Sequence, residues 1–228
     1  MSIFYRGDSL KILKTQIKDK SINLIYINPP FGTTKQYWDE KQDWKALFKE
    51  FFRILKDDGM LVIHCSIPFN YELIRAAPVA PSHSWYWLKE SATCPLIAKL
   101  QPMRIVEEIL VWKNKKSVYY SQKVETNKKK CKNMDETSYY GSTKKKEKVE
   151  YKESRHRTHF LDMKRDIKGF STRPKEMVQL IINSYSKEND TILDLFCYKG
   201  LSYTCKGNRK WIGIDKHFIP NDFITQKN

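Results

Sequence analysis

Short runs of β-branched and aliphatic residues alternate with helical patterns near both ends of this sequence. This alternation indicates an α/β fold, in which helices connect the strands of a largely parallel sheet. Amphipathic helices are predicted over Asp43–Leu55 and, directly after Pro174, over Lys175–Ser186. The strands predicted with them are Ser21–Ile27, Met60–Cys65, Thr191–Phe196 and Trp211–Asp215. Because strands lie at both ends of the chain, we expect the two ends to build one sheet.

The middle of the chain interrupts this pattern. A short helix near Asn70–Ala77 and two pairing strands, Trp85–Leu88 and Glu108–Trp112, are predicted before it. From about residue 113 to 165, apolar periodicity disappears and lysine runs alternate with tyrosines. We therefore expect one α/β domain made of residues 1–112 and 166–228, with a basic insertion at 113–165.

The charge of the chain indicates its partner. The formal net charge is +16 and the pI is near 9.5, while the apolar content is ordinary, so the excess cations must lie on the surface of a folded protein and attract polyanions. Nucleic acid is the expected partner. A membrane partner is not expected, because no apolar run approaches the roughly 20 residues that span a bilayer, and the N-terminus has no signal-peptide core. We expect a soluble intracellular protein that is not secreted.

The lysine runs of the insertion are the candidate DNA contacts. Charge runs are often only solvated loops, but tyrosines among the lysines add surfaces on which bases stack. The candidate DNA-binding residues are Lys128, Lys129, Lys130, Lys144, Lys145 and Lys146.

Cysteine and histidine positions do not indicate a metal site. The five cysteines are scattered and never spaced as CxxC, which indicates free thiols in a reducing compartment. His156 and His159 are the only closely spaced histidines, and no cysteine or second pair lies near them in the sequence to complete a tetrahedral zinc site. No metal is therefore expected.

The C-terminal strands have the pattern of a nucleoside-binding unit. Gly200 follows the first strand and Asp215 ends the next one, about 20 residues on. A glycine there lets the backbone approach a ligand, and a carboxylate at the second strand end accepts hydrogen bonds from ribose hydroxyls. The turn lacks a full glycine-rich pattern, because Tyr198 and Lys199 stand where small residues are usual. An ordinary strand pair with a turn glycine is the alternative.

A rigid motif, Asn28-Pro29-Pro30-Phe31, directly follows the first predicted strand. Its prolines fix φ and lack N–H donors, which leaves carbonyl acceptors at the carboxyl end of a strand, where ligands of open α/β sheets bind. The motif offers acceptors and an aromatic ring but no strong nucleophile. These properties suit methylation of a ring-conjugated amine: Asn28 and a proline carbonyl hold the N–H groups, and Phe31 stacks on a flipped base. A Pro-Pro turn that only ends the strand is the alternative.

The order of these motifs resembles the beta-class DNA amino-methyltransferases of bacterial restriction-modification systems and of some phages and viruses. In that family a (D/N/S)PP(Y/F/W) motif precedes the cofactor motif, and the target-recognition region lies between them. Arg53–Gly59 is similar to the family's RVLKPGG segment, and Asp194–Gly200 to its DPFxGSG segment. Trp87–Lys89 and Glu107–Trp112 resemble its paired strands before the recognition region. The resemblance covers nearly the whole chain.

The resemblance implies a Rossmann-like methyltransferase fold that uses S-adenosylmethionine and releases S-adenosylhomocysteine. The implied fold has a mostly parallel seven-stranded sheet with helices on both faces and the basic insertion as target-recognition region. The implied catalytic residues are Asn28, Pro29, Pro30 and Phe31. The residues implied to bind the cofactor are Asp8, Asn28, Ser171, Thr172, Arg173, Asp194, Phe196, Cys197, Gly200 and Asp215. Among these, Asp8 is implied to lie near the adenine, Arg173 near the methionine carboxylate and Asp215 at the ribose.

The resemblance further implies methylation of the exocyclic N6 amine of adenine in double-stranded DNA. Methylation of cytosine N4 needs the same acceptors, and Phe31 does not decide between the two. A rival from another class is a degenerate methyltransferase fold that only binds nucleic acid, since Tyr198 and Lys199 replace a glycine and a serine of the family pattern. An RNA substrate is a third alternative. A homodimer or a second methyltransferase subunit is the protein partner considered, in a bacterial cytoplasm or in the host cell of a virus.

Overall fold

A computed structural model gives the structure of the chain. It describes residues 2–93, 95, 98–126, 129–131, 148–150, 153–164, 173–220 and 223. The chain divides into two compact units. Met1–Tyr120 together with His159–Asn228 forms the first, here called the body, and Ser121–Thr158 forms the second, here called the insert unit.

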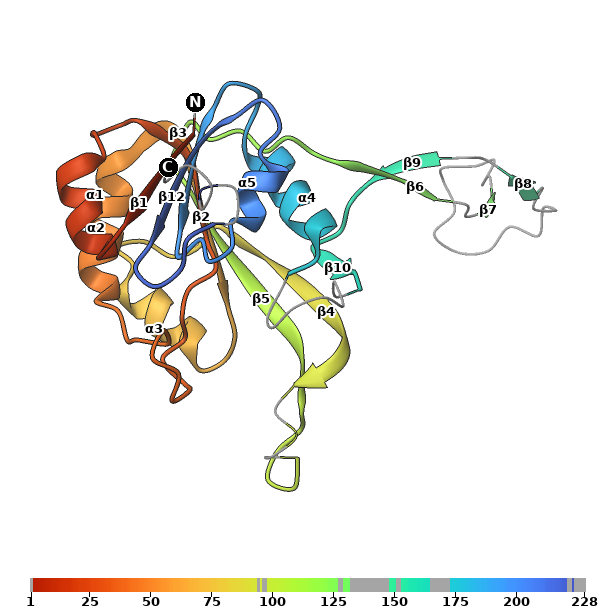
Figure 1. The fold of residues 1–228 in the computed structure, drawn as a ribbon. Coiled ribbons are helices and arrows are strands. Elements are labelled where there is room, and N and C mark those ends of the chain that lie inside the picture. Colours follow the sequence, from red (N-terminus) through yellow and green to blue (C-terminus); the bar gives the residue numbers. More distant parts are fainter. Residues whose placement is uncertain are drawn as a thin grey trace. The chain divides into compact units, whose positions relative to one another are not determined.

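The body is built on one large sheet (Figure 1). Its strand order is β1-β12-β11-β2-β3-β5-β4-β10, and only the pairs β3–β5 and β5–β4 are antiparallel. The strands are β1 (Ser2–Arg6), β2 (Ile22–Ile27), β3 (Leu55–Cys65), β4 (His83–Thr93), β5 (Arg104–Lys113), β10 (Phe160–Asp162), β11 (Thr191–Leu195) and β12 (Lys210–Asp215). The expected mostly parallel α/β sheet is confirmed, but the expected number of seven strands is wrong, because eight are present in the described part. The edge strand β10 pairs with β4 although its residues fall within the expected insertion.

Helices cover both faces of this sheet, as expected. One core contains α1 (Ser9–Gln16), α2 (Trp44–Ile54) and α3 (Phe69–Ala76), and the other contains α4 (Lys175–Tyr185) and α5 (Leu201–Cys205). Strand β2 divides its side chains between the two cores. Ile25 and Ile27 lie in the first core, whereas Leu24 and Tyr26 lie in the second, because successive side chains of a strand point to opposite faces. All six residues of β2 are buried, and all except Asn23 are apolar or aromatic, as expected for a strand covered on both faces.

Local signals set the helix boundaries. The carboxylate of Asp43 caps α2 by accepting a hydrogen bond from Ala46 N at 3.0 Å. The helix ends at Ile54, and the chain passes directly into β3. The Asp57-Asp58-Gly59 segment lies within the first residues of this strand. Helix α4 begins directly after Pro174, as the sequence predicts.

The insert unit contains paired strands. Strand β6 (Lys123–Thr126) pairs antiparallel with β9 (Glu153–His156), and β7 (Lys129–Cys131) pairs antiparallel with β8 (Lys148–Glu150). The chain leaves the body after Tyr120, whose N–H donates to Ser184 O at 2.9 Å, and returns at His159, whose carbonyl accepts from Tyr86 N at 2.8 Å. The insert unit thus spans fewer residues than the expected insertion at 113–165.

Candidate active site

The expected site residues follow strands whose carboxyl ends share one edge of the sheet. Parallel pairing places Leu195 of β11 opposite both Ile27 of β2 and Ile214 of β12. Asn28, Phe196 and Asp215 therefore follow one another along this edge. From β2 the chain continues to β3 on one side, and from β11 it continues to β12 on the other. The boundary between β2 and β11 is thus a topological switch point, where ligands of open α/β sheets bind.

The Asn28–Phe31 motif is anchored by its second half. Pro29 is buried, and Asn28 is half-buried. The Phe31 ring stacks on the Phe69 ring of α3, with centroids 4.8 Å apart and an interplanar angle of 22°. One face of Phe31 is therefore already covered by the protein. This packing fixes the end of the motif against the core, and base stacking on Phe31 stays a prediction.

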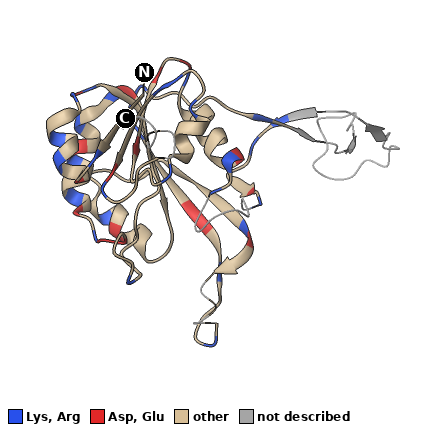
Figure 2. Cartoon of the chain, in the orientation of Figure 1, with Lys and Arg blue, Asp and Glu red and all other residues tan. Residues whose placement is uncertain are grey.

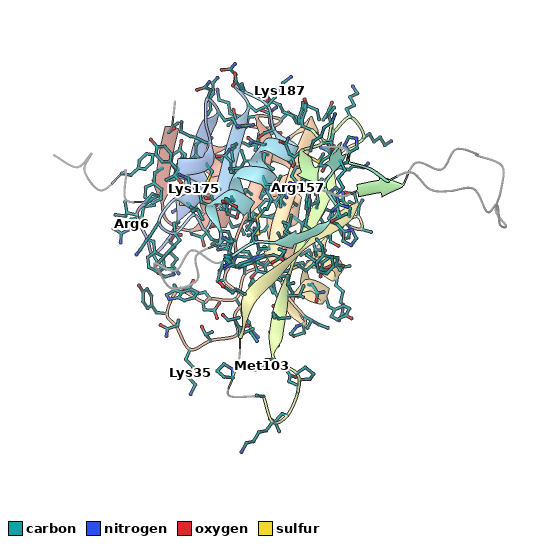
Figure 3. All side chains as sticks on the ribbon, turned by 90° about the vertical axis from the view of Figure 1, so that its right-hand side faces the viewer. Arg6, Lys35, Met103, Arg157, Lys175 and Lys187 are labelled. Atoms are coloured by element: carbon teal, nitrogen blue, oxygen red, sulfur yellow. The ribbon has the colours of Figure 1, made fainter. Side chains whose placement is uncertain are left out.

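The loop after the motif is organised by one buried carboxylate. Asp39 accepts hydrogen bonds from the backbone N–H groups of Gly32, Thr33 and Thr34 at 2.6–2.9 Å and from the Thr34 hydroxyl at 2.7 Å. Burial would raise the pKa of Asp39, but these hydrogen bonds outweigh it and hold the pKa below its ordinary value. Figure 3 shows Lys35 of this loop and Met103 of the β4–β5 hairpin at the same end of the body.

The turn after β11 takes an unusual backbone conformation. Phe196, Tyr198 and Gly200 have φ angles of 60°, 49° and 78°. A Cβ on Gly200 would lie 2.8 Å from the Pro220 Cβ, so only glycine fits there without displacement. Tyr198 occupies a left-handed position that favours glycine, and its ring packs edge-on against Phe218 at 4.5 Å. The bulky side chain of Tyr198 is thus packed against the loop after β12.

Asp215 joins the two turns beside it. Its Oδ2 accepts from Tyr198 N at 2.8 Å, and its Oδ1 accepts from His217 N and Phe218 N, both at 2.8 Å. The carboxylate is buried, with 5% of its surface exposed. A carboxylate has about four acceptor positions, so these three bonds leave one for a further donor.

Asp194 lies under α5 in a different environment. Its Oδ2 accepts a hydrogen bond from the Ser202 hydroxyl, whose oxygen accepts from the Trp211 indole N–H at 2.8 Å. Burial and the negative charge of Asp215 raise the pKa of Asp194, and the hydrogen bond from Ser202 lowers it. Burial is the largest influence, and the resulting pKa is about 8. Asp194 therefore holds the strand to α5 as a largely neutral acid near pH 7. Burial also raises the pKa of the nearby Cys197 thiol well above its ordinary value, which keeps the thiol protonated.

Arg173 lies in a buried ion pair. Its Nε and its terminal nitrogen both contact Glu107 Oε1 at 2.8 Å. Glu107 also contacts His64 Nδ1 at 2.9 Å and Lys89 Nζ at 3.5 Å. Burial would raise the pKa of Glu107, but Arg173, His64 and Lys89 lower it to about 2. Ser171 and Thr172, predicted beside Arg173, lie outside the described residues.

Sequence reasoning missed Glu107 and His64 as members of the site. Both adjoin apolar residues in their strands, and both are almost fully buried, at 4% and 0% exposure. A charged residue inside an apolar run is the signal that points to such a cluster, since charges are seldom buried without partners. Figure 2 shows acidic residues in the middle of β5.

The first expected cofactor residue caps a helix. Asp8 is exposed and accepts a hydrogen bond from Lys11 N at 2.8 Å as the N-cap of α1. The preceding Gly7 N–H donates to the Asp215 carbonyl at 3.0 Å. Asp8 therefore lies at the same sheet edge as Asp215, one strand further out.

The predicted DNA contacts fall in the insert unit or outside the description. Lys129 and Lys130 belong to β7. Lys128, Lys144, Lys145 and Lys146 lie outside the described residues. Contact of these lysines with DNA stays a prediction.

The described residues contain neither a metal-binding cluster nor a membrane-spanning helix. No group of three or more histidine, cysteine, aspartate and glutamate side chains is placed to hold a metal ion. Within the same residues, no helix has the length and apolar content needed to cross a membrane.

A family comparison decides which class these motifs represent. The N6_N4_Mtase model, described as DNA methylase, matches residues 22–218. The chain belongs to this DNA methylase family. The resemblance inferred from the motif order is thereby confirmed at the level of N6 or N4 amino-methyltransferases. A search of curated protein sequences finds no match.

Solved structures of similar fold include several DNA methylases. The M1.HpyAVI–SAM complex has a TM-score of 0.60 and 18% identity, covering 95% of this chain and 94% of that one. PvuII DNA methyltransferase (cytosine-N4-specific) has a TM-score of 0.62 and 17% identity, covering 94% and 82%. TTHA0409 of Thermus thermophilus, a putative DNA modification methylase complexed with S-adenosyl-L-methionine, has a TM-score of 0.60 and 17% identity, covering 94% and 88%. At these identities the likeness establishes the fold.

Proposed function

We propose that this DNA methylase transfers a methyl group from S-adenosylmethionine to the exocyclic N6 amine of adenine in double-stranded DNA. One observation carries the proposal. The Asn28–Phe31 motif and the Gly200 turn follow the neighbouring parallel strands β2 and β11, at the switch point of the sheet. A substrate amine held at the first and a cofactor held at the second would be adjacent, and positioning of this kind supplies most of the catalysis of a direct transfer.

The residues at the ends of β1, β11 and β12 fit an S-adenosylmethionine site. Asp215 keeps about one acceptor position for a ribose hydroxyl. Asp8 at the end of β1 is proposed to lie near the adenine, and the Phe196–Gly200 turn to approach the cofactor through its backbone. Arg173 is proposed to attract the methionine carboxylate while it stays paired with Glu107. When bound, the cofactor supplies an electrophilic methyl group on its sulfonium.

Asn28 is proposed to hold the amine. Its side-chain carbonyl and a proline carbonyl accept the two N–H groups, which favours a pyramidal nitrogen with an available lone pair. Because prolines have no N–H group, Pro29 and Pro30 cannot compete as donors for these acceptors. The chain thus orients the amine without forming a covalent intermediate.

Cytosine N4 is the second candidate target, because the PvuII enzyme of similar fold is named as cytosine-N4-specific. Both amines need the same acceptors. To separate the two targets, purified protein is incubated with S-adenosylmethionine and DNA, and the product is sequenced by a method that reads both modifications. Only N4-methylcytosine in the product would refute the adenine assignment. A substrate trial with RNA under the same conditions tests the remaining alternative.

Asn28→Ala tests the catalytic centre. The substitution removes an acceptor at a half-buried position that no helix or strand depends on, so the rate of methyl transfer should fall at least about 10²-fold while folding and most DNA affinity persist. Transfer rates, thermal unfolding and DNA binding are measured in parallel. Full activity of this variant would show that the catalytic centre lies elsewhere. Calorimetry with S-adenosylmethionine tests the degenerate alternative, since absence of binding at millimolar concentration, with and without DNA, excludes an active enzyme.

Neutralising Lys128, Lys129 and Lys130 tests the insert unit as the DNA-contacting region. Loss of phosphate contacts should weaken binding of all sequences alike and reduce the slope of log K against log salt by about 1 to 3. A matched control replaces three exposed lysines of the body: Lys18, Lys45 and Lys49. An unchanged slope in the first variant would show that those lysines are only solvated.

A further inference from the structure

A buried histidine lies beside the catalytic motif. Strands β2 and β3 pair Tyr26 with Val62 and Ile27 with Ile63, so His64 stands at the next position, level with Asn28. The His64 ring meets the Tyr26 ring edge-on, with centroids 5.3 Å apart. His64 is therefore at the strand end next to the one that carries the motif, on the side of the sheet to which Tyr26 points.

Glu107 determines which ring nitrogen of His64 carries the proton. His64 Nδ1 lies 2.9 Å from Glu107 Oε1, and an ionised carboxylate only accepts hydrogen bonds, so Nδ1 must be the donor. Arg173 and Lys89 keep Glu107 ionised. Burial lowers the pKa of His64, although Glu107 opposes this, and the ring is neutral near pH 7. Its Nε2 is then an acceptor.

This acceptor has no hydrogen-bond partner among the residues that the structure describes. Buried polar atoms are nearly always satisfied, and an exception calls for a functional explanation. His64 is completely buried, and its other nitrogen is firmly bound, so the ring cannot turn Nε2 toward solvent without breaking the contact with Glu107.

Methylation of an amine produces a proton that needs an acceptor. The nitrogen–carbon bond forms as the carbon–sulfur bond breaks and its electron pair stays on sulfur, which leaves the amine with a positive charge and one proton too many. Asn28 can hold an N–H group, but its neutral amide is a very weak base. An imidazole is a far stronger proton acceptor, even when burial lowers its pKa.

Resting on the proposed function, we propose that His64 Nε2 accepts a hydrogen bond from the target amine and takes the proton released by methyl transfer. The amine loses this proton and becomes the neutral methylamine, and His64 becomes an imidazolium whose Nδ1–H stays on Glu107. The charged groups that face the ring are Glu107, which favours this state, and Arg173 and Lys89, which limit it. His64 is thus a catalytic base, and Glu107 is its positioning residue.

Single-turnover methyl transfer measured against pH tests this role. His64→Gln keeps a hydrogen-bond donor toward Glu107 and an acceptor in place of Nε2, but it is not a base at these pH values. In the wild type, the rate should fall as the pH decreases through a pKa below the ordinary histidine value of about 6.5. In His64→Gln, the rate should be about 10²-fold lower and this acidic limb should be absent. His83→Gln is the control. His83 of β4 is hydrogen-bonded to Tyr185 of α4, and this variant should keep the wild-type pH profile.

The outcomes separate the two proposals. A wild type that transfers no methyl group to any nucleic acid overturns the proposed function and this inference with it. An active wild type together with a His64→Gln variant of equal rate and the same acidic limb overturns the role of His64 alone. Nitrogen-15 NMR of wild-type protein with labelled histidines reports directly which ring nitrogen of His64 carries the proton, and it does not depend on a variant that must fold. It should show a neutral His64 protonated on Nδ1, and a ring protonated on Nε2 instead would overturn the inference.

Discussion

Two buried carboxyl groups at the same sheet edge differ in charge. Glu107 and Asp194 are 4% and 3% exposed, so removal from water favours the neutral acid in both. Two cations and a histidine surround Glu107 and lower its pKa to about 2, whereas a hydroxyl and the carboxylate of Asp215 adjoin Asp194, whose pKa is about 8. Burial acts alike on both groups, and the partners decide their charge.

The difference divides the site into two halves. On the β3–β5 side, an ionised Glu107 orients His64 and Arg173. On the β11–β12 side, a largely neutral Asp194 leaves Asp215 as the buried carboxylate that faces the proposed ribose position. Changing each carboxyl group to its amide removes the charge without changing the shape, which makes the two halves directly comparable.

Glu107→Gln should have the largest effect on stability. The variant removes the negative charge that two nitrogens of the buried Arg173 contact, which should cost about 3–5 kcal/mol at pH 7 in urea denaturation. Because the folded-state pKa is lowered, the stabilisation is present above the unfolded value of about 4.5 and is lost as the pH falls toward 2. The neighbouring Glu108, which bonds Asn70, provides the control Glu108→Gln, with an expected loss under about 1 kcal/mol. Equal losses in both variants would contradict the central role of Glu107.

Asp194→Asn should change stability in the opposite direction with pH. The pKa of Asp194 is raised in the folded state. Its ionisation therefore does not destabilise the wild type below about pH 4, and it lowers the free energy of unfolding as the pH rises toward 8. The amide keeps an acceptor for Ser202 and never becomes charged. Between pH 5 and pH 9 the variant should therefore gain about 2 kcal/mol or more relative to the wild type. Chemical denaturation at both pH values measures this, and parallel curves would mean that Asp194 is ionised throughout.

Lys216→Ala should have the smallest effect. Lys216 contacts both Glu40 oxygens at 2.7 and 2.8 Å, but the two side chains are 49% and 42% exposed. Solvent screens such a pair, so its loss should cost less than about 1 kcal/mol and less still in 1 M salt. If Lys216→Ala lost as much stability as Glu107→Gln, solvent exposure would not explain the difference between the exposed and the buried ion pair of this protein.

The sequence predicts the elements whose signals are local. Strand β2, helix α2 and helix α4 lie within about two residues of their predicted bounds. Their apolar residues recur with the period of the element, and Asp43 or Pro174 marks each helix start. The sequence also placed Asn28 and Asp215 each at the end of a predicted strand, and the parallel pairing of these strands with β11 brings their carboxyl ends to the same side of the sheet.

Other features depend on contacts between distant residues. Strand β10 has three residues and is a strand only because β4 offers a free edge. Helix α5 has five residues and no apolar period, so no pattern predicts it. Glu107 and Arg173 are 66 positions apart in the sequence, so the sequence shows both charges but not that they contact each other. The contacts of Glu107 therefore depend on the three-dimensional fold, whereas the position of Asp215 at the end of a strand follows from the local sequence pattern.

The way the insert unit joins the chain has a consequence for evolution and for engineering. Strands β6 and β9 run side by side, and Arg157 N donates to Gln122 O at 3.3 Å, so the outgoing and returning segments are neighbours at the base of the unit. Both segments meet body residues, Tyr120 and His159, that have their own hydrogen bonds within the body. The insert unit is therefore joined to the body at two neighbouring points of the chain. We expect that a short turn between its first and last strands would close the chain, and that the corresponding unit of another DNA methylase could be joined at the same two points while the large sheet is kept.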